Sequence, residues 1–154
     1  MTAAPMSAET MLAELEPFVA GEVNRHLATT KDWYTHEYVP WSEGRTFDGI
    51  LGGEPWEPSQ QRFASAARTA FIVNLLTEDN LPSYHREIAL RFGPDGAWGQ
   101  WVGQWTAEEG RHSIAIRDYL VVTRGVDPVA LERGRMVHMA AGYDSGDKSM
   151  LEAL

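Results

Sequence analysis

The stretch WTAEEGRHSIAIRDYL (Trp105–Leu120) is rich in helix-forming residues, yet it carries charged groups where a buried helix face is expected. At about 100° per residue, Ile116 and Leu120 lie within about 40° of Glu109 around the helix axis. His112 lies about 60° from Glu109, one turn further on. The spacing therefore predicts a carboxylate and an imidazole on the core-facing side. Because an ionised carboxylate is costly to bury alone, we expect a compensating partner.

The composition is that of one acidic domain without cysteine. The chain has 154 residues and a net charge of −9, which argues against a nucleic-acid surface. No run approaches the roughly 18 apolar residues of a membrane span. The absence of cysteine excludes disulfides and thiolate metal sites, and it favours a cytoplasmic location.

The hydrophobic pattern predicts an all-α chain. Apolar residues recur at helical spacing in four segments, and residues 40–58 are too rich in Gly and Pro for regular structure. We expect helices from Ser7 to about Leu27, from an N-cap at Ser59 to about Phe92, from about Trp98 to Arg124, and from Asp127-Pro128 to near Gly142. The final SMLEAL (149–154) has the pattern of a fifth helix that is just beginning.

A second carboxylate points inward from the second predicted helix. Glu78 shares a helix face with Phe71 and Leu81. Pro82 follows four residues later and lacks the N–H that the Glu78 carbonyl would accept, so the helix should be distorted there. Non-ideal backbone beside a polar core residue is often functional, although a plain kink would follow the same pattern.

Two inward carboxylates and one imidazole form a ligand set that suits iron or manganese. Ferritin-like carboxylate bundles build a two-metal site from two helices with one Glu each and two helices with Glu-x-x-His. This chain has one helix of each kind, Glu78 on the second and Glu109-x-x-His112 on the third. The residues alone leave a second interpretation open, in which these side chains hydrogen-bond one another in a metal-free core.

Two motifs in order resemble the soluble acyl-acyl-carrier-protein (acyl-ACP) desaturases, the stearoyl-ACP desaturase family, and most closely the actinobacterial branch. TEDNLPSY (77–84) is similar to the family's TEEALPTY, and WTAEEGRH (105–112) to its WTAEENRH. HLATTKDWYTHEYVP (26–40) resembles a further family segment, and VDPVALE (126–132) follows as expected. The resemblance covers the chain from about Leu15 and implies a ferritin-like helical bundle, incomplete here, with only its first helices.

The resemblance also implies a site with a pair of iron ions. By position in the motifs, Glu78, Glu109 and His112 correspond to iron ligands. Glu108 corresponds to a carboxylate beside the ligands rather than to a ligand. The family's reaction inserts a cis double bond into an ACP-bound fatty acyl chain with O₂ and two electrons from ferredoxin, and the protein supplies a shaped, dry tunnel.

Three further residues take their expected roles from the same resemblance. Thr77 is expected on the oxygen-binding side of the iron pair, and Trp105 near the catalytic centre. Trp33 is expected near the cofactor, on the route of incoming electrons. Acyl-ACP is acidic, so its docking would use arginines of the third and fourth predicted helices, unless these only form a solvated face. The candidates are Arg111, Arg117, Arg124, Arg133 and Arg135.

The sequence contains a single Glu-x-x-His, whereas the family uses two. Three hypotheses account for this difference. The chain is the N-terminal portion of a desaturase, or it forms a homodimer in which two copies complete the iron site, or it is a metal-free helical interaction module. The sequence therefore leaves open whether this chain alone is an enzyme.

Overall fold

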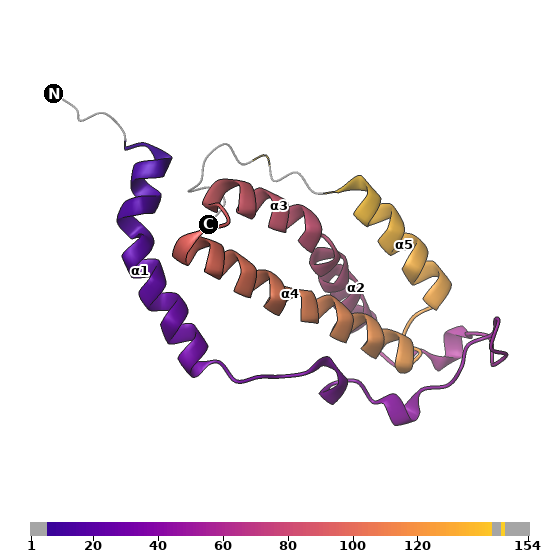
Figure 1. Cartoon of the computed structure of the whole chain (residues 1–154). Coiled ribbons are helices and arrows are strands. Elements are labelled where there is room, and N and C mark those ends of the chain that lie inside the picture. Colours follow the sequence, from indigo (N-terminus) through magenta and orange to yellow (C-terminus); the bar gives the residue numbers. More distant parts are fainter. Residues whose placement is uncertain (1–5, 143–145, 147–154) are drawn as a thin grey trace. The chain divides into compact units, whose positions relative to one another are not determined.

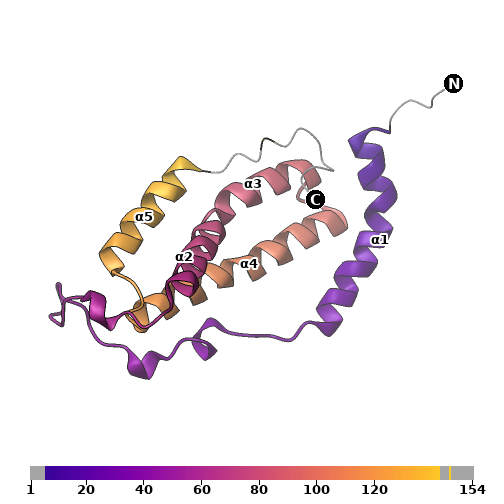
Figure 2. The same ribbon diagram turned by 180° about the vertical axis from the view of Figure 1, so that it is seen from behind.

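The computed structural model describes residues 6–142 and 146, and it is helical (Figures 1 and 2). The α-helices are α1 (Ala8–Thr29), α2 (Ser65–Asp79), α3 (Leu81–Phe92), α4 (Gly96–Val122) and α5 (Pro128–Ala141). Within these described ranges no strand occurs, and Phe47 and Glu54 form an isolated bridge. The predicted all-α class is confirmed. None of the described helices combines the length and apolar character that crossing a bilayer requires.

The prediction of the second helix is wrong in two respects, its first residue and its continuation as one helix to Phe92. Ser59 does not cap it, because Ser59 lies inside a 3₁₀ helix, η3 (Pro58–Gln60), and α2 begins only at Ser65. The helix also stops at Asn80, whose backbone N–H donates to the Thr77 carbonyl at 3.1 Å. This tight turn ends α2 just before Pro82, which cannot donate to the Glu78 carbonyl. One predicted helix is therefore two.

The other predicted helices lie close to their expected bounds. Ser7 caps α1 by accepting from the Thr10 N–H, and Asp127 caps α5 by accepting from two backbone N–H groups. The third predicted helix is α4, which starts slightly earlier than expected. Two further 3₁₀ helices, η1 (Thr35–Glu37) and η2 (Trp41–Glu43), interrupt the long segment between α1 and α2. The predicted helix at 149–154 falls outside the described residues.

The described part of the chain divides into two compact units, and the first contains residues 6–32 and 82–107. Its core consists of Phe92, Trp98 and Val102, against which Leu12 and Val19 of α1 pack. The Trp98 indole N–H donates to the Leu12 carbonyl at 3.0 Å. Glu16 of α1 accepts from the Ala97 N–H, which places a carboxylate at the positive N-terminal end of α4.

The second unit contains residues 33–81 and 108–142. Leu75 of α2, Leu120 of α4 and Leu131 of α5 form its core together with Val126. The aromatic residues Phe63, Phe71 and Tyr119 pack their rings within about 6 Å of one another at its edge. Since α2 and the second half of α4 both contribute to this core, it holds together the two segments that carry the Glu and His side chains of interest.

Arg124 anchors the irregular segment to the second unit. Its side chain is buried, and its guanidinium donates to the carbonyls of Glu54 and Pro55 and to the Gln60 side chain. The same guanidinium lies 4.0 Å from the centroid of the Phe47 ring. Its backbone has a φ of 55°, which ends α4 and aims the side chain at the loop. One arginine thus satisfies carbonyls that no regular structure pairs.

Candidate metal centre

Three side chains with metal-ligand atoms gather in the second unit. They are Glu78 near the C-terminal end of α2 and the pair Glu109 and His112 on α4. One ligand atom from each lies within 4.8 Å of the other two. The three side chains are 25%, 28% and 39% exposed respectively, so the site is lined by protein but reachable by an ion.

The imidazole of His112 presents one particular nitrogen to both carboxylates. Its Nδ1 lies 2.8 Å from Glu109 Oε2 and 3.6 Å from Glu78 Oε1. One face of the ring is covered by Trp33, whose indole stacks on the imidazole with a 14° interplanar angle and a centroid distance of 5.8 Å. The stacking therefore restrains the plane of the imidazole, whose Nδ1 faces the carboxylates.

Arg111 fixes Trp33 in turn. Its guanidinium donates to the Trp33 carbonyl at 3.0 Å and also lies over the Trp33 ring, 4.9 Å from the centroid. Tyr38 meets the same indole edge-on, at a centroid distance of 5.5 Å. Trp33 is thus packed between the guanidinium, the phenol and the imidazole, which restricts the motion of the His112 ring.

Burial and neighbouring charges shift the pKa of Glu78. Partial burial raises the pKa of Glu78 above its ordinary value, and the nearby Glu109 carboxylate raises it further. His112 opposes this rise by favouring the charged form. Two carboxylates close together repel one another, so a bound cation would relieve the repulsion.

The three donors fit an iron or manganese ion. Two carboxylate oxygens and an imidazole nitrogen make up the borderline-hard ligand set of such metals. All three approach a common point, and their partial exposure leaves a way in. The three side chains could therefore hold a metal ion, while the 2.8 Å contact between His112 Nδ1 and Glu109 Oε2 is also the length of a hydrogen bond.

The remaining predicted site residues occupy distinct places. Trp33 lies against His112, as described above. Thr77 is exposed, and its hydroxyl donates to the Val73 carbonyl at 3.0 Å. Glu108 is half-buried and does not belong to the three-residue donor group. Trp105 belongs to the first unit, where its ring centroid lies 6.4 Å from that of Trp101.

The predicted docking arginines do not form one surface. Arg124 is buried and holds the loop, while Arg111 packs on Trp33. Arg117 and Arg135 pair with Glu132, and Arg135 also binds Asp79. Arg133 is exposed. The expectation of a shared ACP-docking face on these five residues is wrong for Arg124, because its side chain is buried and its donors bind groups of the irregular segment.

Sequence reasoning missed the structural roles of Asp79 and Arg111. Asp79 is buried next to Glu78, and a charged residue there needs a partner that the sequence does not name. Arg111 was visible only as a possible docking cation. The signal that could have revealed its role is its position next to His112 in the sequence.

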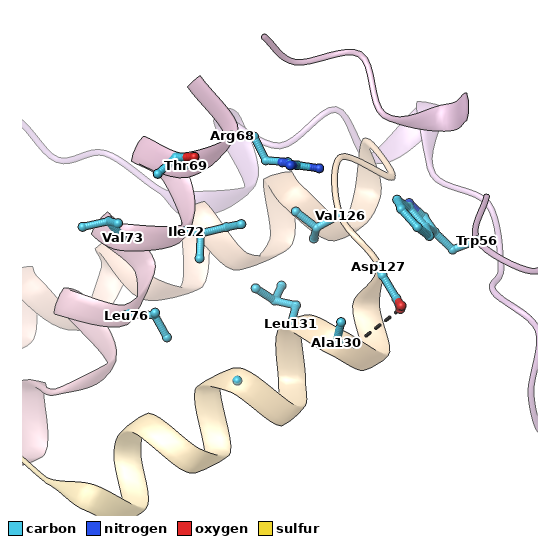
Figure 3. Close-up of a pocket in the computed structure, with 11 residues that line it drawn as sticks. Trp56, Arg68, Thr69, Ile72, Val73, Leu76, Val126, Asp127, Ala130 and Leu131 are labelled. Carbon is cyan, nitrogen blue, oxygen red and sulfur yellow. Dashed lines mark hydrogen bonds between the residues drawn. The ribbon is translucent and has the colours of Figure 1, made fainter. Parts of the chain in front are cut away.

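A groove of about 390 Å³ lies between α2 and α5 in the same unit (Figure 3). Its walls are largely apolar, with Ile72 and Leu76 on α2 facing Leu131 on α5. Trp56, Arg68 and Asp127 line its end near the start of α5. None of the three candidate ligands contributes to its walls. The groove and the candidate metal centre are therefore separate features.

Comparison with known sequences points to one family. The sequence model of the family described as fatty acid desaturase matches residues 7–151. DesA1 of Mycobacterium tuberculosis, a protein named as an acyl-ACP desaturase, is 56% identical over 136 residues, which are 88% of this chain and 40% of DesA1. DesA2 of the same organism, with the corresponding name, is 44% identical over 147 residues, or 96% of this chain and 53% of DesA2.

A solved structure is also similar. The X-ray structure of DesA2 from M. tuberculosis superimposes with a TM-score of 0.56 at 41% identity, covering 80% of this chain and 45% of DesA2. The likeness confirms the predicted ferritin-like helical class. The chain spans about half the length of the relatives that it matches, or less.

Proposed function

Because the chain belongs to the fatty acid desaturase family, we propose that Glu78, Glu109 and His112 are iron ligands of an acyl-ACP desaturase site. The observation that carries the proposal is the convergence of these three donors within 4.8 Å, from two helices that share one core. When bound by these three residues, iron would supply the O₂-dependent oxidation by which a cis double bond would be introduced into the acyl chain. The substrate that we propose is a fatty acyl group carried by ACP.

The chain's own residues have binding and orienting roles in this proposal. The two carboxylates and His112 Nδ1 hold the metal, and Trp33 keeps the imidazole aimed at it. Trp33 is also the proposed entry point for electrons, because its indole stacks on the proposed ligand His112. Glu108 remains a neighbouring carboxylate, while Thr77 and Trp105 are proposed to border the reaction site.

The reaction requires partners, which are likewise proposals. Removing two hydrogens with O₂ requires two further electrons, for which a ferredoxin-type protein is the proposed donor. A second copy of the chain is the proposed source of the remaining iron ligands, since the sequence has one Glu-x-x-His. Exposed Val129, Met136 and Val137 on α5 support such an association, being 55%, 62% and 75% exposed. The cysteine-free sequence supports a cytoplasmic location.

The proposal is tested by measuring mass and iron on the same sample. The 154-residue chain is prepared anaerobically with ferrous iron and passed through light scattering, and the eluted peak is analysed for metal. A dimer with about one iron per chain supports a site completed by two copies. A folded chain that retains no iron would refute ligation by this chain and favour the metal-free helical module.

A further inference from the structure

The second unit contains a buried ion pair immediately beside a proposed ligand. Arg135 of α5 donates to both carboxylate oxygens of Asp79, from Nε at 2.6 Å and from Nη2 at 2.8 Å. The two side chains are 14% and 3% exposed. Such a planar, two-point contact fixes orientation as well as distance. Asp79 is the residue after Glu78, so the pair fixes the backbone that carries this carboxylate.

The ion pair continues to the helix that carries the other two ligands. Arg135 also donates from Nη1 to Glu132 Oε2 at 2.9 Å, and Glu132 accepts from Arg117 of α4 at 2.9 Å. Arg117 lies five residues after His112 on the same helix. Side chains of α5 thus connect the end of α2, which carries Glu78, to the helix that carries Glu109 and His112.

The helix break makes this connection necessary for Glu78. Because α2 stops at Asn80, the hydrogen-bond ladder of a continuing helix does not hold the Glu78 segment from its C-terminal side. Asn80 itself contacts α5, with its Nδ2 donating to His138 Nε2 at 2.5 Å. The two residues that follow Glu78, at the break between α2 and α3, therefore both contact α5.

We propose that Arg135 is a positioning residue for the metal centre, setting the place of Glu78 relative to Glu109 and His112 through its two-point contact with Asp79. This inference rests on the proposed iron ligation. It adds a requirement that the ligand motifs do not contain, since Arg135 lies outside both motifs and on a different helix. Loss of the contact should leave a folded chain whose three donors no longer converge.

The test compares metal binding by Arg135→Met with binding by the wild-type chain and by Arg133→Met. Arg133 is an exposed arginine on the same helix and serves as the matched control. Each protein is titrated anaerobically with ferrous iron and with cobalt(II), whose visible absorption reports the ligands around the ion. Circular dichroism and thermal unfolding establish that each variant is folded at the assay temperature.

We expect Arg135→Met to bind both metals about 10- to 100-fold more weakly, with an altered cobalt spectrum, while Arg133→Met behaves as wild type. A merely structural role would lower the unfolding temperature and leave the affinity of the folded chain unchanged. Affinity within twofold of wild type, with the same spectrum, overturns the inference and leaves the proposed function standing. A wild-type chain that binds neither metal overturns the proposed function, and the inference with it.

If Arg135→Met does not fold, metal binding by Arg135→Lys tests the inference instead. Lysine keeps the positive charge next to Asp79 but lacks the planar fork that contacts both oxygens. A folded Arg135→Lys chain with about tenfold weaker cobalt binding supports the inference. Binding within twofold of wild type overturns it.

Discussion

Glu108 and Glu109 are neighbours in the sequence, yet their side chains leave the helix about 100° apart. Glu109 reaches His112 Nδ1 at 2.8 Å and belongs to the donor group, whereas Glu108 does not. We therefore expect Glu109→Ala to abolish iron retention and Glu108→Ala only to weaken it. Iron per chain after gel filtration measures both, with the wild-type chain as reference. Equal losses from the two substitutions would contradict the assignment of Glu109 as the ligand.

The raised pKa of Glu78 predicts a pH dependence with a definite sign. The folded chain holds this proton more tightly than the unfolded chain, so the metal-free protein gains stability from it below the ordinary pKa of 4.5. That contribution is lost as pH rises through the raised pKa. Metal affinity changes in the opposite sense, because ligation needs the deprotonated carboxylate.

Thermal unfolding of the metal-free chain measures this effect. The difference in midpoint between the wild type and Glu78→Gln, followed from about pH 4 to about pH 7, should shift against the wild type as pH rises. Glu108→Gln is the control for removing a nearby charge. Parallel pH profiles for wild type and Glu78→Gln would show that the Glu78 proton is not held more tightly in the fold.

At the scale of helices, the side chain of Asp127 caps the N-terminus of α5. Asp127 accepts from the Val129 N–H at 2.9 Å and from the Ala130 N–H at 3.3 Å. Asp127→Ala should lower the free energy of unfolding by about 1 kcal/mol, since two N-terminal donors lose their acceptor. Asp127→Asn keeps an oxygen at the cap and should lose much less. Urea unfolding of the three proteins provides the comparison, and equal stability of the Ala and Asn variants would argue against the cap.

The hydrophobic pattern alone did not predict the break between α2 and α3. The hydrophobic spacing from Phe63 to Phe92 continues through Asn80 as if one helix ran throughout. Pro82 indicated a distortion near Glu78, but a proline can produce either a kink or an end. The turn at Asn80 is held by His138 of α5, a contact distant in sequence. Whether the helix bends or ends near Pro82 therefore involves contacts with α5, and the local sequence pattern does not reveal where α5 lies.

At the scale of the molecule, the core of the second unit joins three helices through a few side chains. Leu120 is fully buried among Leu75, Val126 and Leu131. Leu120→Ala should destabilise the chain by about 2–5 kcal/mol, because it removes apolar contacts and leaves a cavity. Ile114→Ala on the same helix, at a side chain that is 49% exposed, should cost far less. Denaturant unfolding followed by circular dichroism compares them, and similar losses would place the core elsewhere.

The sequence by itself determined the helical class, the Asp127 cap of α5 and the identity of the candidate ligands. These features follow from short-range rules: helical periodicity, capping side chains and the Glu-x-x-His spacing all act within a few residues. It also determined that Glu109 and His112 share a helix face, since they are one turn apart.

Only the tertiary structure decided which residues distant in the sequence contact one another around these side chains and in the rest of the second unit. Three contacts join positions that are 56 to 79 residues apart in the sequence. They are the stacking of Trp33 on His112, the pairing of Asp79 with Arg135 and the anchoring of the loop by Arg124. A buried charge requires a partner, but its sequence position does not say which one. The choice is made when helices pack, because burial then leaves each charge only the partners that the neighbouring elements provide.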